Sequence, residues 1–210
     1  AMSSSLVGSE MCIRDSMWLV HQRSFTYGAL LLVLLTVKSA FAGVAIEDYE
    51  RRPDIQNRLL EERLDALLPT LMRETSVDMW LVIAREYNDD PVFLSLVPKP
   101  RFTARRTTML AFFDRGDAGV ERLTVSRYPL GAMYEAAWEG GDLDAQWQRL
   151  AEVIAERDPQ TIAVNTSDTW PVADGISHSL YSKLAASLSP ELQTRLQSSE
   201  RLVVRWMETR

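Results

Sequence analysis

The sequence is poor in side chains that bind metals or act as nucleophiles. Its 210 residues include one cysteine, Cys12, and two histidines, His21 and His178. A single cysteine excludes an internal disulfide and a cysteine-rich metal site. Because metal sites need several convergent donors, we expect His178 to be an ordinary surface or half-buried helix residue, with a metal ligand as the alternative.

Basic charge is also scarce. The chain has 23 Lys and Arg against 29 Asp and Glu. Residues 1–42 hold three of the basic and two of the acidic residues, so residues 43–210 carry a net charge of −7. Nucleic acids and anionic lipids require a basic face, so we expect neither as a general partner.

Short motifs of common catalytic folds are missing as well. The sequence contains no G-x-S-x-G elbow, no P-loop, no G-x-G-x-x-G fingerprint and no H-E-x-x-H helix. These motifs mark serine hydrolases, nucleotide-binding proteins and zinc peptidases. No catalytic residues, metal ligands or cofactor are therefore predicted for this chain.

The first 42 residues are expected to lie outside the fold. Residues 1–16 show no periodicity and precede a second possible start at Met17, so we interpret them as an artefactual or disordered extension. Residues 17–42 have the three parts of a secretory signal peptide, with a short positive segment, the apolar run FTYGALLLVLLTV and a small-x-small site.

The predicted cleavage site is formed by Ala40 and Ala42, which would leave Gly43 as the new N-terminus. A membrane anchor is the alternative, but an apolar run of about 13 residues is short against the ~20 needed to span a bilayer. We therefore expect export to the periplasm or beyond, without a stable membrane anchor, and a folded domain over residues 43–210.

A helix followed by a buried strand opens this domain. Apolar residues recur at spacings of three and four from Ile55 to Leu71, which predicts an amphipathic helix capped by Asp54 and kinked or restarted at Pro69. Residues 79–84 (MWLVIA) are apolar without alternation, as in a strand covered on both faces; a buried helix is the alternative.

The later segments complete an α/β pattern with a mixed sheet flanked by helices. We predict strands at 107–113 and 120–126 joined as an antiparallel hairpin, a helix after Asp142, a strand at 161–165, a helix around 176–188 and a strand-like segment at 201–206. The hairpin makes the sheet mixed.

Two polar or aromatic segments are candidate surfaces for interaction or substrate gating. The first follows the strand at 79–84, where ligands often meet open α/β sheets. Its residues are Arg85, Glu86, Tyr87, Asn88, Asp89 and Asp90. The second contains Tyr134 and Trp138, in a loop whose rings pack on the core or on a partner. A solvated turn is the alternative for the first segment.

Three nearby arginines form the only basic concentration after the leader. Arg101, Arg105 and Arg106 lie within six residues of one another. Because the domain around them is acidic, we expect them to pair with carboxylates of the 86–90 segment rather than to bind phosphate.

Several strings, in this order, resemble a known family. They are RLDALLPTLMRE, SVDMWLVIAREYNDDPVFLSLVP, TTMLAFFD, VERLTVSR, AEVIAERDPQTIAVNTSD and SERLVVRWMETR. The stretch over residues 50–210 resembles the N-terminal, creatinase-like domain of secreted bacterial M24 metallopeptidases, the Xaa-Pro aminopeptidase, prolidase and creatinase group. MWLVIAREYNDDPVF is the most specific string.

The resemblance implies an α/β domain with a mixed sheet between helices. It also implies a following catalytic domain, in which two aspartates, a histidine and two glutamates hold a divalent metal pair. None of those ligands can be assigned to this chain, so we expect the chain to be a fragment that is inactive alone. Its implied partners are the missing catalytic domain and further copies of itself in a homo-oligomer.

Three functions remain open at this point. The first is the non-catalytic N-terminal domain of an exported Xaa-Pro-type metallopeptidase, which supports oligomerisation and substrate access. The second is a free-standing periplasmic binding or interaction module. The third is a complete α/β hydrolase that uses Asp89, Asp90 and His178. If the chain is a fragment, apolar surface around Trp138 and Trp206 should be exposed.

Overall fold

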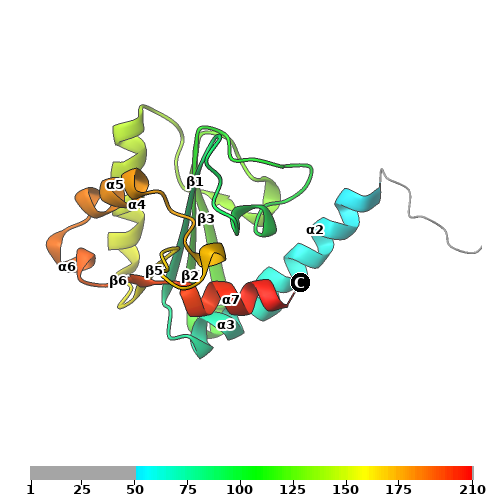
Figure 1. The fold of residues 1–210 in the computed structure, drawn as a ribbon. Helices are drawn as coiled ribbons and strands as arrows, with labels where there is room; N and C mark the ends of the chain where they lie inside the picture. The colour runs from blue at the N-terminus through cyan, green and yellow to red at the C-terminus, as the bar shows by residue number, and fades with distance from the viewer. Residues whose placement is uncertain (1–50, 210) are drawn as a thin grey trace, which may run out of the picture. The chain divides into compact units, whose positions relative to one another are not determined.

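A mixed six-stranded sheet forms the centre of the molecule (Figure 1). The computed structural model describes residues 51–209. The strands are β1 (Met79–Arg85), β2 (Thr107–Asp114), β3 (Val120–Ser126), β4 (Glu135–Ala136), β5 (Ile162–Val164) and β6 (Leu196–Ser198), in the order β4-β3-β2-β1-β5-β6. This confirms the predicted α/β class. The signal-peptide prediction and its cleavage residues Ala40, Ala42 and Gly43 lie outside the described residues.

Strand β1 occupies a central position between β2 and β5. It pairs antiparallel with β2 and parallel with β5. Its residues Met79 to Ala84 are all buried, which confirms the strand predicted from its continuous apolar run. The β2–β3 hairpin is also confirmed, and its turn uses Gly119 at a φ of +78°, a conformation that favours glycine.

Helices cover both faces of the sheet (Figure 1). They are α2 (Arg52–Glu62), the π-helical η2 (Arg63–Leu67), α3 (Leu68–Glu74), α4 (Leu143–Arg157), α5 (His178–Ser187), α6 (Pro190–Gln193) and α7 (Glu200–Glu208). Short 3-10 turns are η3 (Phe93–Ser95), η4 (Gly116–Ala118), η5 (Gly131–Met133) and η6 (Pro171–Ala173). One core lies under α4, α5 and α6, and the other lies under α3 and α7.

The first helix differs in detail from its prediction. It begins at Arg52, and no side chain caps its first turn, so the predicted Asp54 cap is wrong. Asp54 instead lies within the first turn, where the helix dipole favours a negative charge. The break predicted at Pro69 is present as η2, after which the helix restarts as α3 with the proline in its first turn.

The segment predicted as strand-like at 201–206 is the helix α7, so that prediction is wrong. Leu202, Val203 and Trp206 are buried on one face, whereas Arg201 and Arg205 are exposed on the other. A spacing of three and four residues between buried side chains is helical. The β-branched pair at 203 and 204 had suggested a strand.

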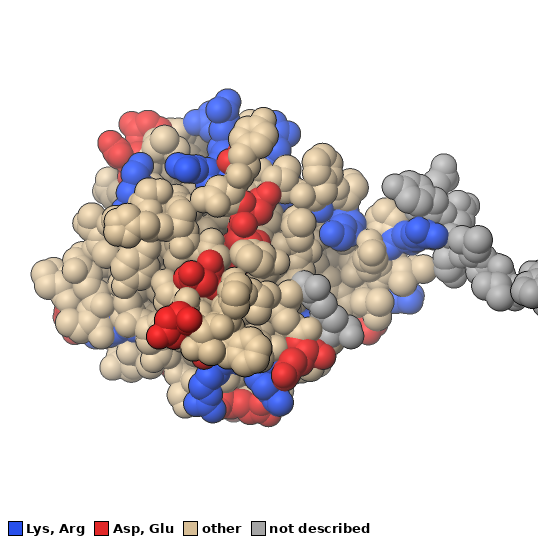
Figure 2. Space-filling view, viewed as in Figure 1, with Lys and Arg blue, Asp and Glu red and all other residues tan. Residues whose placement is uncertain are grey.

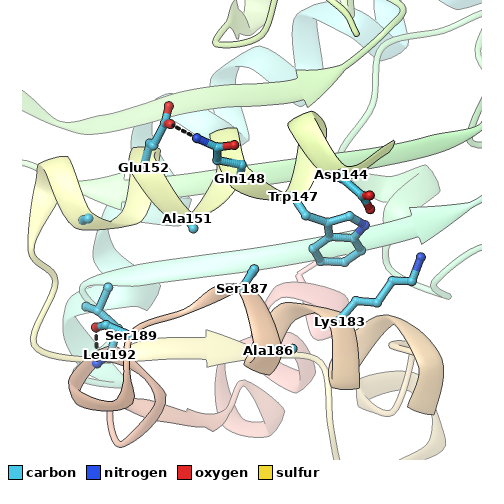
Figure 3. A pocket seen from close by; sticks show the side chains of 11 residues that line it. Asp144, Trp147, Gln148, Ala151, Glu152, Lys183, Ala186, Ser187, Ser189 and Leu192 are labelled. Carbon is cyan, nitrogen blue, oxygen red and sulfur yellow. Dashed lines mark hydrogen bonds between the residues drawn. The ribbon is translucent and has the colours of Figure 1, made fainter. Parts of the chain in front are cut away.

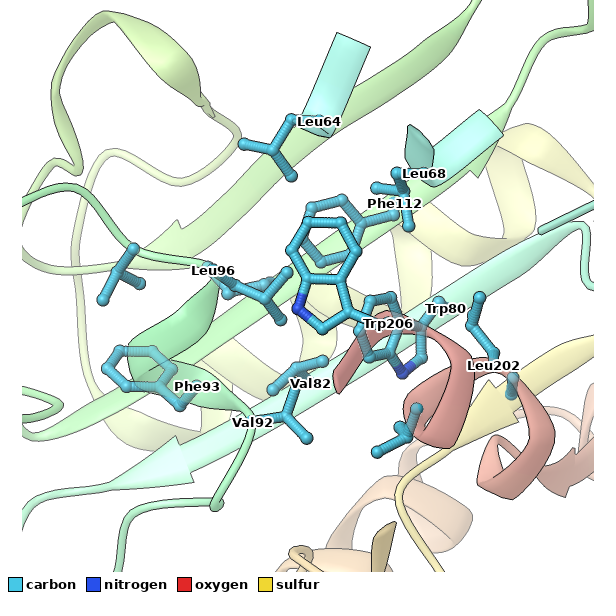
Figure 4. Packing of buried hydrophobic residues seen from close by; sticks show 14 of the residues in the cluster. Leu64, Leu68, Trp80, Val82, Val92, Phe93, Leu96, Phe112, Leu202 and Trp206 are labelled. Carbon is cyan, nitrogen blue, oxygen red and sulfur yellow. The ribbon is translucent and has the colours of Figure 1, made fainter. Parts of the chain in front are cut away.

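Trp206 packs into the core that Figure 4 shows, among Leu64, Leu96 and Phe112. Its side chain is fully buried, its Nε1 donates to Ser95 Oγ at 2.8 Å, and the Arg63 guanidinium lies 3.9 Å from the ring centroid. The expectation of exposed apolar surface at Trp206 is therefore wrong.

Capping side chains fix the helices on the opposite face. Asp142 accepts a hydrogen bond from the Ala145 amide at 2.8 Å at the start of α4, as predicted. Ser177 caps α5 through the Leu180 amide. Between residues 51 and 209, no helix combines the length and the apolar character needed to cross a bilayer.

Candidate functional site

The polar segment after β1 begins as a tight turn. The Arg85 amide donates to the Asn88 carbonyl at 3.2 Å, and the Asn88 amide donates to the Arg85 carbonyl at 2.7 Å. Tyr87 adopts a left-handed φ of +67° and is 97% exposed. Because the turn closes on its own backbone, it projects the tyrosine ring into solvent.

Two carboxylates of this segment bind the backbone of the returning loop. Asp89 accepts from the Thr103 hydroxyl at 2.7 Å and from the Ala104 amide at 2.6 Å. Glu86 accepts from the Arg106 amide at 3.2 Å. These carboxylates fix the loop before β2 and thereby set the position of the arginines that it carries.

The predicted pairing of Arg101, Arg105 and Arg106 with the 86–90 carboxylates is wrong. Among the described residues, none of their guanidinium groups forms an ion pair with a carboxylate. Instead, Arg105 stacks over the Tyr128 ring at 4.5 Å, and Arg101 donates to the Pro129 carbonyl at 3.1 Å. The carboxylates of Glu86, Asp89 and Asp90 instead accept hydrogen bonds from backbone amides and from polar side chains.

Asp90 is enclosed, although its neighbours are exposed. It is 1% exposed. One carboxylate oxygen accepts from the Val92 amide at 2.9 Å, and the other accepts from the Asn165 side-chain amide at 2.8 Å. Burial raises the pKa of Asp90 to about 6; the hydrogen bonds from Val92 and Asn165 oppose this shift, and the charge of Asp174 adds to it.

Asn165 extends this contact into a network between distant segments. Its side-chain oxygen accepts from Trp80 Nε1 of β1 at 2.8 Å and from the Ser199 hydroxyl, which precedes α7, at 2.5 Å. All four side chains, those of Asp90, Asn165, Trp80 and Ser199, are at most 1% exposed. We call these four residues the Asp90 network.

Gly175 closes the network from the remaining side. A Cβ at Gly175 would lie 2.2 Å from the carboxylate carbon of Asp90. No side chain fits there, so the glycine is needed for space and not for its backbone angles. Because Asp90 is enclosed, the prediction that it lies on a contact or gating surface is wrong. Through Asn165, Asp90 is linked inside the fold to Trp80 of β1 and to Ser199, which precedes α7.

Tyr134 is likewise a core residue and not a surface contact. It is 5% exposed, its hydroxyl donates to the Leu96 carbonyl, and its ring meets Phe112 edge-on at 6.0 Å between centroids. Burial raises the pKa of the Tyr134 phenol above its ordinary value. Trp138 is half-buried and packs beside Gly141 near the start of α4.

His178 lies exposed in the first turn of α5, as expected for a helix-surface residue. Residues 51–209 contain no group of three or more His, Cys, Asp or Glu side chains close enough to hold a metal ion. The three residues of the hydrolase hypothesis have different environments. Asp89 binds the backbone of a loop, Asp90 is enclosed and His178 is exposed.

Sequence reasoning missed an open groove between α4 and α5 (Figure 3). Its volume is about 620 Å³. Trp147, Ala151 and Ala186 line it, and Asp144 and Lys183 lie toward one end. The small side chains on both helices leave the space between them, but alanines alone give no sequence signal for a groove.

Comparisons with known proteins identify no relative. No family model, no curated protein and no solved structure matches the chain.

At one end of the sheet, the described residues form both a buried hydrogen-bond network and an exposed surface that could bind other molecules. The Asp90 network is a closed set of hydrogen bonds, suited to holding strands and helix together. The surrounding loops carry exposed guanidinium groups and aromatic rings, suited to binding carboxylates and apolar side chains.

Proposed function

We propose that this chain is the non-catalytic N-terminal α/β domain of an exported metallopeptidase of the Xaa-Pro aminopeptidase, prolidase and creatinase group. In that role it packs against a catalytic domain, supports oligomerisation and limits substrate access. The observation that carries the proposal is the stretch MWLVIAREYNDDPVF, which carries the resemblance to that group. The metal pair and the hydrolytic chemistry belong to the catalytic domain.

The environment of that stretch supports a structural role. It forms β1, the exposed turn and the start of η3, and its last aspartate, Asp90, is held by Asn165 of a segment that follows β5. An enclosed carboxylate has no path to a substrate, so the stretch is better suited to scaffolding than to acid or base chemistry. This argues against the hydrolase that would use Asp89, Asp90 and His178.

The alternative is a free-standing binding or interaction module. The groove between α4 and α5 favours it, because a concave surface of this size suits a small ligand or a peptide. Trp147 provides an aromatic wall, and Lys183 and Asp144 provide opposite charges at one end.

Reading the gene beyond the codon for Arg210 separates the two functions. The proposal expects an in-frame continuation that supplies two aspartates, a histidine and two glutamates as metal ligands. A stop codon at that point would favour the free-standing module. The purified 210-residue chain provides a second test: it should not hydrolyse Xaa-Pro peptides when Mn²⁺, Co²⁺ or Zn²⁺ is added, and turnover would refute the assignment of the chemistry to another domain.

A further inference from the structure

Arginines from three chain segments meet at one end of the sheet. The register pairs Arg85 of β1 with Thr107 of β2, so Arg106 lies at the same end. The end of β3 lies opposite the start of β2, which places the next residue, Arg127, there as well. Figure 2 shows Lys and Arg atoms gathered at the top of the view, where Figure 1 places the loops around this end of β1.

Two further arginines join them from the loop before β2. Arg105 lies over the Tyr128 ring, and Arg101 reaches the Pro129 carbonyl. Burial and then the nearby charge of Arg105 lower the pKa of Arg101, as expected where like charges gather. We call these five residues, Arg85, Arg101, Arg105, Arg106 and Arg127, the arginine edge.

No carboxylate among residues 51–209 forms an ion pair with any guanidinium group of the arginine edge. Elsewhere in the domain, several arginines form two ion pairs each. Arg149, Arg157 and Arg195 each contact two carboxylates within 3.2 Å. In an acidic chain, five arginines together without a carboxylate partner indicate a surface whose counter-charge comes from another molecule.

The shape of the arginine edge adds apolar contacts to this charge. Two clefts lie at the arginine edge, with volumes of about 610 and 680 Å³; Pro129 lines the first and Tyr128 lines the second. Arg101, Phe102 and Arg105 line the first, and Arg106, Arg127, Tyr128 and Trp138 line the second. Phe102 is 79% exposed, so the clefts present apolar rings as well as guanidinium groups.

We propose that the arginine edge is a docking surface for an acidic, partly apolar segment of a partner protein. Guanidinium groups bind carboxylates in a bidentate manner, and the rings accept the apolar side chains between them. A uniform polyanion fits less well, because Glu61 lines the first cleft and Asp142 and Asp144 line the second. The arginine edge would bind such a segment whichever of the two functions the domain has.

The test is a fluorescence-anisotropy titration of the full 210-residue chain with a labelled peptide that alternates glutamate and leucine. The same peptide with glutamine in place of glutamate serves as the uncharged probe. We expect the glutamate peptide to bind, and its affinity to fall by about tenfold or more in the variant Arg85→Glu, Arg105→Glu, Arg106→Glu. All three side chains are exposed, so the variant should keep the wild-type circular dichroism.

A matched control reverses three exposed cations elsewhere, at Arg51, Arg115 and Arg201. It changes the net charge equally and should bind the peptide within about twofold of wild type. Equal binding of the glutamate and glutamine peptides, no binding of either, or equal loss in the control would each overturn the proposal. Tighter binding to double-stranded DNA or to phosphatidylserine vesicles than to the glutamate peptide would also overturn it.

Discussion

The turn after β1 leads into two polar regions that satisfy their charges in opposite ways. In the Asp90 network, every polar side chain has an internal partner and none is more than 1% exposed. In the arginine edge, only a few residues away, Arg101 and Arg127 donate to backbone carbonyls and Arg105 lies over a ring. None of the five guanidinium groups forms an ion pair with a described carboxylate. Two residues of the same polar segment, 85–90, therefore have different roles. Asp90 contributes to stability inside the fold, and Arg85 belongs to an open surface.

Because the Asp90 network leaves no room for a side chain at Gly175, adding one there should cause the largest loss of stability. Gly175→Ala places a Cβ 2.2 Å from the Asp90 carboxylate carbon. We expect the free energy of unfolding to fall by about 3 kcal/mol or more, because the enclosed carboxylate must move away from its donors. Urea denaturation measures this loss.

Gly131→Ala is the comparison, since nothing lies within 4 Å of its Cβ position and only its φ of +74° opposes alanine. It should cost about 1 kcal/mol. If Gly175→Ala lowered the free energy of unfolding less than Gly131→Ala, the residues around Asp90 would be able to rearrange, which would contradict a tightly packed network.

Removing the centre of the network should have the next largest effect. Asn165→Ala leaves Asp90, Trp80 and Ser199 without the partner that they share. Buried polar groups without partners cost about 1–3 kcal/mol, so we expect a loss of about 2–3 kcal/mol in thermal or urea unfolding. Asn88→Ala, in the exposed turn, should stay within about 0.5 kcal/mol of wild type. Equal losses at the two asparagines would contradict the contrast.

The buried carboxyl should also give the protein an unusual pH dependence. The pKa of Asp90 is about 6 in the fold, above its ordinary value near 4, so the folded state binds the proton more tightly than the unfolded state. This group therefore adds stability as the pH falls from 7 towards 5, by about 1.4 kcal/mol, and the gain is lost again as the pH rises through 6. Asp90→Asn should lack this gain.

The measurement is the difference in unfolding free energy between wild type and Asp90→Asn across that pH range. The paired carboxylates Asp114 and Glu121 work in the other direction, because hydrogen bonds from Arg73 and Arg157 lower their pKa values. Their contribution is lost only at more acidic pH, below their ordinary values. A wild-type protein whose stability relative to the variant is flat from pH 7 to 5 would contradict an enclosed Asp90.

Local sequence signals predicted the frame of the fold well. The continuous apolar run at 79–84 identified β1, the Asp and Gly residues at 114–119 identified the hairpin, and Asp142 identified the start of α4. Each of these signals lies within the element that it predicts or directly beside it. The strand-like prediction for 201–206 was wrong because the segment is short. Its adjacent valines are typical of strands, whereas the helical spacing of Leu202, Val203 and Trp206 spans only one turn.

The site could not be predicted in the same way. Asp89-Asp90-Pro91 has the composition of a solvated turn, and the burial of Asp90 depends on Asn165, which lies 75 residues further along the chain. Tyr134 is buried through Leu96, which lies 38 residues earlier in the chain, and through Phe112, which also belongs to another segment. The arginine edge arises from strand register, so its parts at 85, 106 and 127 are scattered in the sequence.

The contrast between paired and open arginines is tested most directly by one urea-denaturation series on two triple variants. The first is Arg85→Gln, Arg105→Gln, Arg106→Gln, and the second is Arg149→Gln, Arg157→Gln, Arg195→Gln. We predict that the first changes the free energy of unfolding by no more than about 1 kcal/mol, whereas the second loses about 2–3 kcal/mol with its ion pairs. An equal or greater loss in the first variant would contradict the account, because the open arginines would then be satisfied inside the fold.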